Sequence, residues 1–339
     1  MNLLEPWVLL RIIAGIVTTA FFVRAATTSV RVLRHFDLES YAEGQLALER
    51  QVELASTFVR VATVMQIGSL ALSSLAADRL SRGIRGAMCA YGVFNANEWG
   101  FRALASTVLV AVLGGVLAQV YAFDARTTTL ALVRKLSVFT LILAPLAALD
   151  LALTSAFLLK LDLSITASCC SVQLDAAAAG NGGFAHGPRI IAATLAPIAI
   201  AIAIAVAFAA LRRPKPPLVF AAGVFALIAF PLALGAAVLE VAPYAFELPQ
   251  HVCPFCLLKA DVLGIGYPLF GSILLAVIWG AGAAVVALLA SAAAAREVFE
   301  SFVRSRLRRE IAAWSICVIL CVLPVARYAW LTGAVSLFP

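Results

Sequence analysis

Five of the seven cysteines of this chain occur in three short motifs whose side chains suit soft-metal or thiol chemistry. The motifs are Met88–Cys89, the vicinal pair Cys169–Cys170, and His251–Cys256, in which two cysteines flank a Pro-Phe dipeptide. Thiolates and thioethers prefer soft ions such as Cu(I), and paired thiols also form and exchange disulfides. The motifs therefore predict that the chain handles either a soft metal ion or a dithiol/disulfide couple.

The segment from His251 to Cys256 is the most specific of the three motifs. Its two-residue spacing lets the sulfurs of Cys253 and Cys256 address one centre, as metal ligands or as a redox pair. The proline between them stiffens that turn. His251 is a candidate third ligand or general base, and the alternative is a surface histidine with no role at the site.

The other two motifs each have a structural alternative. Cys169 and Cys170 cannot easily form a relaxed disulfide with each other, because adjacent alpha carbons lie only about 3.8 Å apart. They are predicted to clamp one thiophilic ion or to pair with a distant cysteine, unless they simply pack at a helix end. Met88 and Cys89 combine a thioether with a thiol, which suits cuprous ion; a buried structural turn is the alternative.

The composition indicates a polytopic membrane protein. Apolar residues make up 63% of the chain, charged residues 13%, and the mean hydropathy is +1.01, values that exclude an ordinary soluble domain. Apolar segments near or above the roughly 20 residues needed to cross a bilayer predict an all-α bundle of about eight transmembrane helices, in a single integral domain over 1–339. The expected spans are residues 6–23, 55–76, 104–123, 138–159, 190–211, 217–241, 267–291 and 311–331.

The distribution of arginine and lysine predicts the orientation of these spans, because cytoplasmic loops carry the excess of both. Loops one, three, five and seven are the richer set, with four arginines between 304 and 309 alone. Both termini are therefore expected on the extracytoplasmic side. Loops 78–103, 160–189 and 242–266 then carry all three cysteine motifs to that face. The side of loop two stays open, because its basic run over 78–85 favours the cytoplasm.

Ionisable side chains inside the spans are costly and need partners. Asp150 is the one acidic residue near the middle of an expected span, and an arginine is expected to neutralise its charge. The intramembrane candidates are Arg11, Arg60 and Arg327, and the sequence does not choose among them. A structural buried pair is favoured over an ion pathway through Asp150.

The order of the cysteines over about residues 160 to 290 resembles vitamin K epoxide reductase and its bacterial disulfide-forming relatives. The shared order is a pair of loop cysteines, two spans and then Cys-x-x-Cys-Leu, and here these residues are Cys169, Cys170, Cys253, Cys256 and Leu257. The resemblance implies quinone-linked disulfide formation. The chain departs from that family because its loop cysteines are adjacent. Lys259 and Asp261 also follow the motif where the family continues into an apolar helix beside its quinone.

A shorter resemblance, of Ser168-Cys169-Cys170, is to mercuric-ion uptake proteins of the bacterial inner membrane. The patterns together favour an inner-membrane protein whose extracytoplasmic cysteine cluster binds or transfers a soft, Cu(I)-like metal ion. A membrane thiol–disulfide oxidoreductase coupled to a quinone is one alternative, and a non-catalytic subunit with loop-stapling disulfides is another. Whether the chain is an enzyme therefore stays open.

The expected surroundings follow from the same patterns. The location is predicted to be the bacterial inner membrane, with multiple passes. Expected partners are membrane lipid, other membrane subunits, and an extracytoplasmic metallochaperone or thiol protein. Nucleic acid is not expected despite the net charge of +7, because the basic residues are spread over the loops as topology requires.

Overall fold

The computed structural model describes residues 5–36, 43–127, 130–164, 166, 186–249, 251–289, 296–335 and 337–338. These residues are helical and form no β-strand; an isolated bridge joins Arg85 to Thr166. Eight helices are long and apolar enough to cross a membrane. The prediction of an all-α, multi-pass membrane protein with about eight spans is confirmed.

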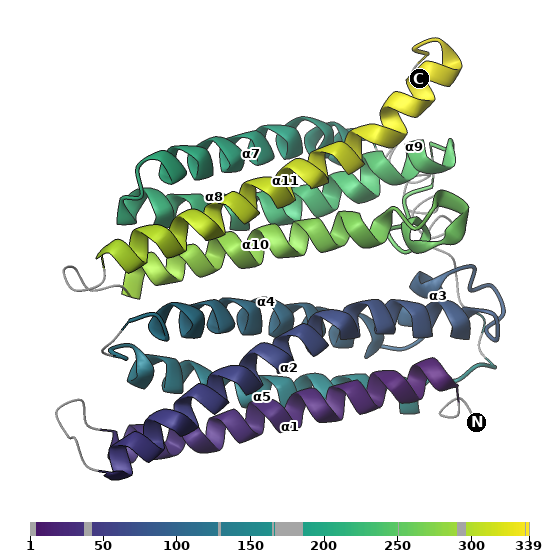
Figure 1. Ribbon diagram of the computed structural model, residues 1–339. Coiled ribbons are helices and arrows are strands. Elements are labelled where there is room, and N and C mark those ends of the chain that lie inside the picture. Colours follow the sequence, from purple (N-terminus) through teal and green to yellow (C-terminus); the bar gives the residue numbers. More distant parts are fainter. Residues whose placement is uncertain are drawn as a thin grey trace. The chain divides into compact units, whose positions relative to one another are not determined.

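The elements follow one another along the chain with short connections (Figure 1). They are α1 (Pro6–His35), α2 (Glu43–Ser81), α3 (Ala90–Phe94), α4 (Gly100–Asp124), α5 (Val133–Leu159), α7 (His186–Arg212), α8 (Pro216–Ala236), a π-helical turn (Ala237–Val241), α9 (Ala242–Phe246), two 3-10 turns (Cys256–Leu258 and Ala260–Val262), α10 (Gly266–Leu289) and α11 (Arg296–Thr332).

Several helices continue past the apolar run that marks the membrane span. Helix α2 begins at Glu43 and α11 at Arg296, each at least three turns ahead of the expected span. Leu, Glu, Gln, Ala and Arg are good helix formers, so polar sequence of this kind sustains a helix outside the apolar zone. Helix α8 runs through the π-helical turn into α9, so this span extends over Pro216–Phe246.

The described helices fall into two compact units. The first comprises Met1–Ala76, Ala96–Asp162 and Val285–Val303, and the second comprises Ala77–Asn95, Leu163–Ala284 and Arg304–Pro339. The first unit therefore contains α1, α4, α5 and most of α2. The second contains α3, α7, α8, α9, most of α10 and most of α11.

Close helix packing holds the first unit together, with α5 lying against both α1 and α4. Phe21 of α1 stacks on Phe58 of α2 with ring centroids 5.5 Å apart. At Gly114 of α4 an added Cβ would lie 2.8 Å from Thr63 Oγ1 of α2. Glycine at this position therefore lets α4 and α2 approach, as small residues do between membrane helices.

A buried polar network crosses the interior of the first unit. Asp150 of α5 accepts hydrogen bonds from Gln66 Nε2 at 2.8 Å and from Ser106 Oγ at 2.6 Å. Arg11 of α1 lies 3.5 Å from the same carboxylate and donates to Thr154 Oγ1 at 3.1 Å. Arg11 is thus the arginine beside Asp150, and both charges are buried with hydrogen-bond partners.

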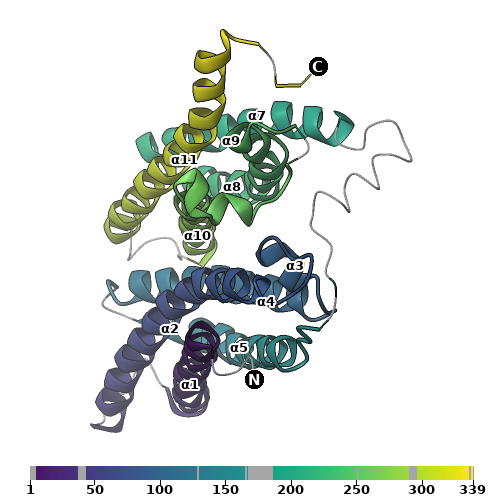
Figure 2. The ribbon, with the colours of Figure 1, turned by 90° about the vertical axis from the view of Figure 1, so that its right-hand side faces the viewer.

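In the second unit, α7 lies along α8, and α8 packs closely on α10 (Figures 1 and 2). An added Cβ at Gly223 of α8 would lie 2.6 Å from the carbonyl oxygen of Gly280 in α10. The two backbones therefore touch at a pair of glycines. This contact fixes the depth at which α10 sits against α8.

One end of the second unit gathers the end of α9 and the end of α11. Arg327 of α11 lies 3.4 Å from Glu247, and the rings of Tyr244 and Tyr328 are 5.5 Å apart. The loop from 247 to 265 starts at this end and leads into α10. Its cysteines therefore lie at the same end of the unit.

Candidate metal centre

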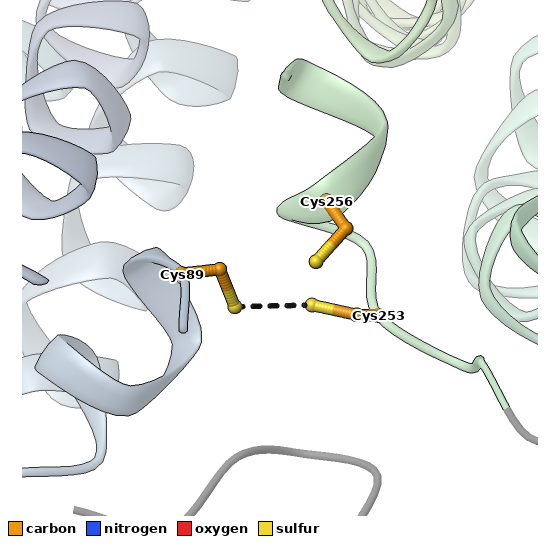
Figure 3. Close-up of side chains that lie close together, drawn as sticks. All are labelled: Cys89, Cys253 and Cys256. Carbon is orange, nitrogen blue, oxygen red and sulfur yellow. Dashed lines mark hydrogen bonds between the residues drawn. The ribbon is translucent and has the colours of Figure 1, made fainter. Parts of the chain in front are cut away.

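Three buried thiols from two distant segments of the second unit converge on one point (Figure 3). The sulfur atoms of Cys89, Cys253 and Cys256 all lie within 4.8 Å of one another. Cys89 Sγ and Cys253 Sγ are 3.4 Å apart. Cys89 and Cys253 have no exposed surface and Cys256 is 5% exposed.

Cys89 is placed by the turn that leads into the short helix α3. Its backbone is extended (φ −157°), and it is the residue immediately before Ala90, where α3 begins. The Gly92 N–H donates to the Cys89 carbonyl oxygen at 3.1 Å, which fixes this start. The side chain therefore leaves the turn toward the loop that carries the other two cysteines.

Cys253 and Cys256 are presented by a loop that reverses direction after α9. Glu247 ends α9 in the left-handed conformation (φ 56°), a common helix ending. Pro254 and Phe255 then lead into a 3-10 turn that begins at Cys256. Because only two residues separate the cysteines within this tight turn, both sulfurs point to the same side of the loop.

Aromatic side chains enclose the three thiols. Tyr91, Phe246 and Phe255 pack against them, and Phe94 of α3 contacts Phe255 with ring centroids 5.2 Å apart. These rings exclude water from one side of the sulfur cluster. An ion bound there would therefore be held in a low-dielectric, dry environment, where charge interactions are strong.

Lys259 links the two cysteine-bearing segments. Its Nζ donates to the carbonyl oxygen of Met88 at 2.7 Å, directly before Cys89. A cation is thereby held beside a group of potential anions. The Met88 side chain is 71% exposed, and its thioether is not part of the sulfur group. The peptide oxygen of Met88, rather than its sulfur, is thus the atom that joins the two segments.

His251 lies at the edge of the cluster and keeps one unused nitrogen. Its ring packs on Phe246 with centroids 4.1 Å apart, and its buried Nε2 has no hydrogen-bond partner among the described residues. Burial lowers the pKa of His251, the Cys89 thiol opposes that shift, and Lys259 adds to it. The imidazole is therefore neutral at neutral pH, which is the form that binds metals.

The thiols themselves hold their protons strongly. The pKa of Cys256 is raised above its ordinary value by hydrogen bonding with Cys253 and Cys89, and burial adds to this effect. Several thiolates so close together would repel one another. A cation removes this repulsion, because it replaces the protons and neutralises the thiolates that it binds.

The sulfur geometry is compatible with two kinds of chemistry. Metal–thiolate bonds of about 2.3 Å place the sulfurs of one ion about 3.8–4.0 Å apart, and the spacing here brackets that value. A disulfide needs sulfurs about 2.05 Å apart. The 3.4 Å between Cys89 and Cys253 is therefore a contact between thiols that a modest movement converts into a bond.

The remaining candidate residues lie elsewhere. Cys169 and Cys170 fall outside the described residues; Thr166, the last described residue before them, pairs with Arg85. Arg60 is exposed and donates to Ser56 of its own helix at 3.0 Å. Arg327 pairs with Glu247, as described above.

Some functional features were not singled out in the sequence. The aromatic enclosure by Tyr91, Phe246 and Phe255, and the Lys259–Met88 link, depend on contacts between segments far apart in the chain. The nearness of these aromatics to the cysteines in sequence was the available signal. Comparison of the chain with protein-family models, with curated proteins and with solved structures finds no match in any of the three.

Proposed function

We propose that the chain is a membrane protein that binds one soft metal ion, Cu(I) in the first instance, through Cys89, Cys253 and Cys256. The observation that carries this proposal is the convergence of three buried sulfurs within 4.8 Å from segments about 165 residues apart. A cluster of that kind is poorly explained by apolar packing alone, because thiols so close together compete for their protons.

The donor set favours Cu(I) over harder ions. Thiolates are soft ligands that select Cu(I) or Zn²⁺ over Mg²⁺ or Ca²⁺, and three sulfurs suffice for a low-coordinate cuprous site. Lys259, held at the peptide oxygen of Met88, offsets the net negative charge of three thiolates around one monovalent ion. Zn²⁺ would need a fourth ligand, for which His251 Nε2 is the nearest candidate of the described residues.

The expected setting is the extracytoplasmic face of a bacterial inner membrane. The excess of arginine in loops one, three, five and seven supports this orientation through the positive-inside tendency. A metallochaperone or a thiol protein on that side is the proposed donor or acceptor of the ion, with other membrane subunits and lipid as further partners. Ligand exchange between thiols is the proposed route of transfer.

A second candidate function is thiol–disulfide exchange. The specific observation in its favour is the 3.4 Å contact between Cys89 Sγ and Cys253 Sγ. Formation of that disulfide releases two electrons and two protons, so it requires an acceptor such as a membrane quinone or a disulfide of another protein. A disulfide that forms once and never turns over would instead be a structural link between the two segments.

The test is metal stoichiometry on the full-length protein purified without oxygen, with a free-thiol count before and after chelation. Wild type, Cys89→Ser and Cys253→Ser are compared with Cys317→Ser, which removes a buried cysteine of α11 outside the cluster. One copper ion per chain is expected in wild type and in Cys317→Ser. Little or none is expected in the two cluster variants.

Two results would redirect the proposal. Zinc in place of copper, lost in His251→Ala as well as in the cysteine variants, would indicate a four-ligand zinc site. No metal at all, together with a Cys89–Cys253 disulfide that a mild reductant opens, would place thiol–disulfide exchange first. A disulfide that resists reduction would favour the structural link.

A further inference from the structure

A second functional group lies inside the second unit, away from the thiol cluster. Glu310 of α11 has no exposed surface, and neither of its carboxylate oxygens has a hydrogen-bond partner among the described residues. It also makes no ion pair with them. An isolated carboxylate in an apolar interior is very unfavourable, so the group must gain a proton or a cation there.

The surroundings of Glu310 contain no charge to pair with it from the neighbouring helices. Its Oε1 lies 2.9 Å from where a Cβ would stand on Gly280 of α10, and Ala226 of α8 borders the same glycine at 2.8 Å. Helices α8 and α10 carry no charged side chain, and Tyr267, near the start of α10, is their one titratable group. Glu310 therefore faces a surface of small apolar residues.

On α11 itself the flanking groups are Arg306, one turn before, and Trp314, one turn after. Trp314 has no exposed surface, and its indole Nε1 has no hydrogen-bond partner among the described residues. Residues four apart lie on the same face of a helix. Trp314 therefore offers a donor to which an ionised Glu310 could turn, while Arg308 and Arg309 are exposed.

The depth of Glu310 places it within the apolar zone. Gly280, which it contacts, is 14 residues from the start of α10 and nine from its end, so it lies about 21 Å from the thiol end and about 14 Å from the other end. The arginines before Glu310 lie toward that other end. A proton could reach the carboxyl from there over a distance of about two turns of α11.

We propose that Glu310 is a proton-binding site of the membrane interior, held as a neutral carboxylic acid against Gly280 and able to exchange its proton with the arginine-bearing end of α11. Buried acidic groups in membrane helices mark proton and ion pathways. The site is independent of the thiol cluster, and its ligand is a proton rather than a metal ion.

The test uses the full-length protein in lipid nanodiscs and a hydrophobic carbodiimide. A protonated carboxyl adds across one C=N bond of the reagent, its proton moves to nitrogen, and acyl transfer from oxygen to nitrogen gives a stable N-acylurea with no leaving group. Peptide mass spectrometry is expected to find the adduct at Glu310. Glu240, which is paired with Arg189 at 2.8 Å, is expected to stay unmodified and serves as the internal control.

A second measurement keeps the result independent of reagent access. The infrared C=O band of a protonated carboxyl is expected in wild type and in Glu240→Gln, and it is expected to be missing in Glu310→Gln. Labelling of wild type should fall about tenfold per pH unit once the group titrates.

Two outcomes would overturn the assignment. A band unchanged in Glu310→Gln, with no adduct in wild type, would mean that Glu310 is ionised and structurally paired. Protection from labelling by Na⁺ or K⁺ at constant pH would make the ligand a metal cation rather than a proton.

Discussion

At the scale of single residues, the chemistry of the second unit depends on which protons the thiols keep. Cys89, Cys253 and Cys256 stabilise one another's protonated forms, and Cys256 shows this as a raised pKa. His251 shifts in the opposite direction, because burial disfavours its charged form. Neutral thiols beside a neutral imidazole form a site that is stable without an ion and still offers four donor atoms to one.

We therefore predict that copper binding weakens as the pH falls. The thiol of Cys256 is protonated below its raised pKa, so each ion must displace protons, and acidification favours the displaced form. Binding should release at least one proton and lose about tenfold in affinity per pH unit for each proton released. Competition titration with a cuprous chelator between pH 6 and 8 measures this slope. An affinity that is independent of pH would mean that the thiolates are already formed without metal.

The prediction of this site from sequence was partial for a physical reason. The spacing of Cys253 and Cys256 is local, so it can be read without a fold. Bringing Cys89 to them depends on how two loops pack, and topology could assign only a common face. Glu310 was not recognised as intramembrane because the hydropathic run begins one residue after it, at 311, while the helix and its buried face begin earlier.

At the scale of elements, hydropathy located all eight long helices but not their lengths. An apolar run records where a helix crosses lipid, whereas α2 and α11 continue into water on residues with high helix propensity. The pairing of Arg11 with Asp150 was also beyond the sequence, because three arginines were equivalent candidates until α1 and α5 were seen to pack together.

Glycine contacts set the packing of α10 in the second unit, and this gives a test at the scale of helices. Gly280→Ala would place a Cβ 2.8 Å from that of Ala226 and 2.9 Å from Glu310 Oε1. We expect a loss of about 1–3 kcal/mol in stability from this overpacking. Gly271→Ala, on the same helix with nothing within 4 Å of the added Cβ, is the control and should be neutral or slightly stabilising. Thermal unfolding in matched detergent compares the two.

The four-helix network of the first unit offers a second test at this scale. Arg11→Leu leaves the buried Asp150 carboxylate without its cation, and the expected cost is about 3–5 kcal/mol. Arg11→Leu/Asp150→Leu removes both charges and should recover part of that loss. Arg60→Leu, at an exposed arginine bonded within its own helix, should change stability by about 0.5 kcal/mol or less. A double variant no more stable than Arg11→Leu would mean that Asp150 matters for its hydrogen bonds rather than for its charge.

At the scale of the whole molecule, each unit contains one kind of buried polar chemistry. The first unit satisfies its intramembrane charges internally through Arg11, Asp150 and their hydroxyl partners. The second leaves Glu310 without a partner among the described residues and gathers free thiols at one end. Functional chemistry is therefore concentrated in the second unit, while the first is internally neutralised.

The orientation of the chain decides which compartment the thiols meet, and it follows from charge alone. Arginine-rich loops favour the cytoplasm, so the loop from 247 to 265 is predicted to face outward. Leu263, which is 97% exposed in that loop, and the exposed Arg308 at the opposite end of the second unit serve as probes. In intact cells, Leu263→Cys should react with a membrane-impermeant maleimide, whereas Arg308→Cys should react only after permeabilisation. The reverse pattern would place the thiol cluster in the cytoplasm, where reducing conditions keep thiols free, and an extracytoplasmic metal donor could no longer be its partner.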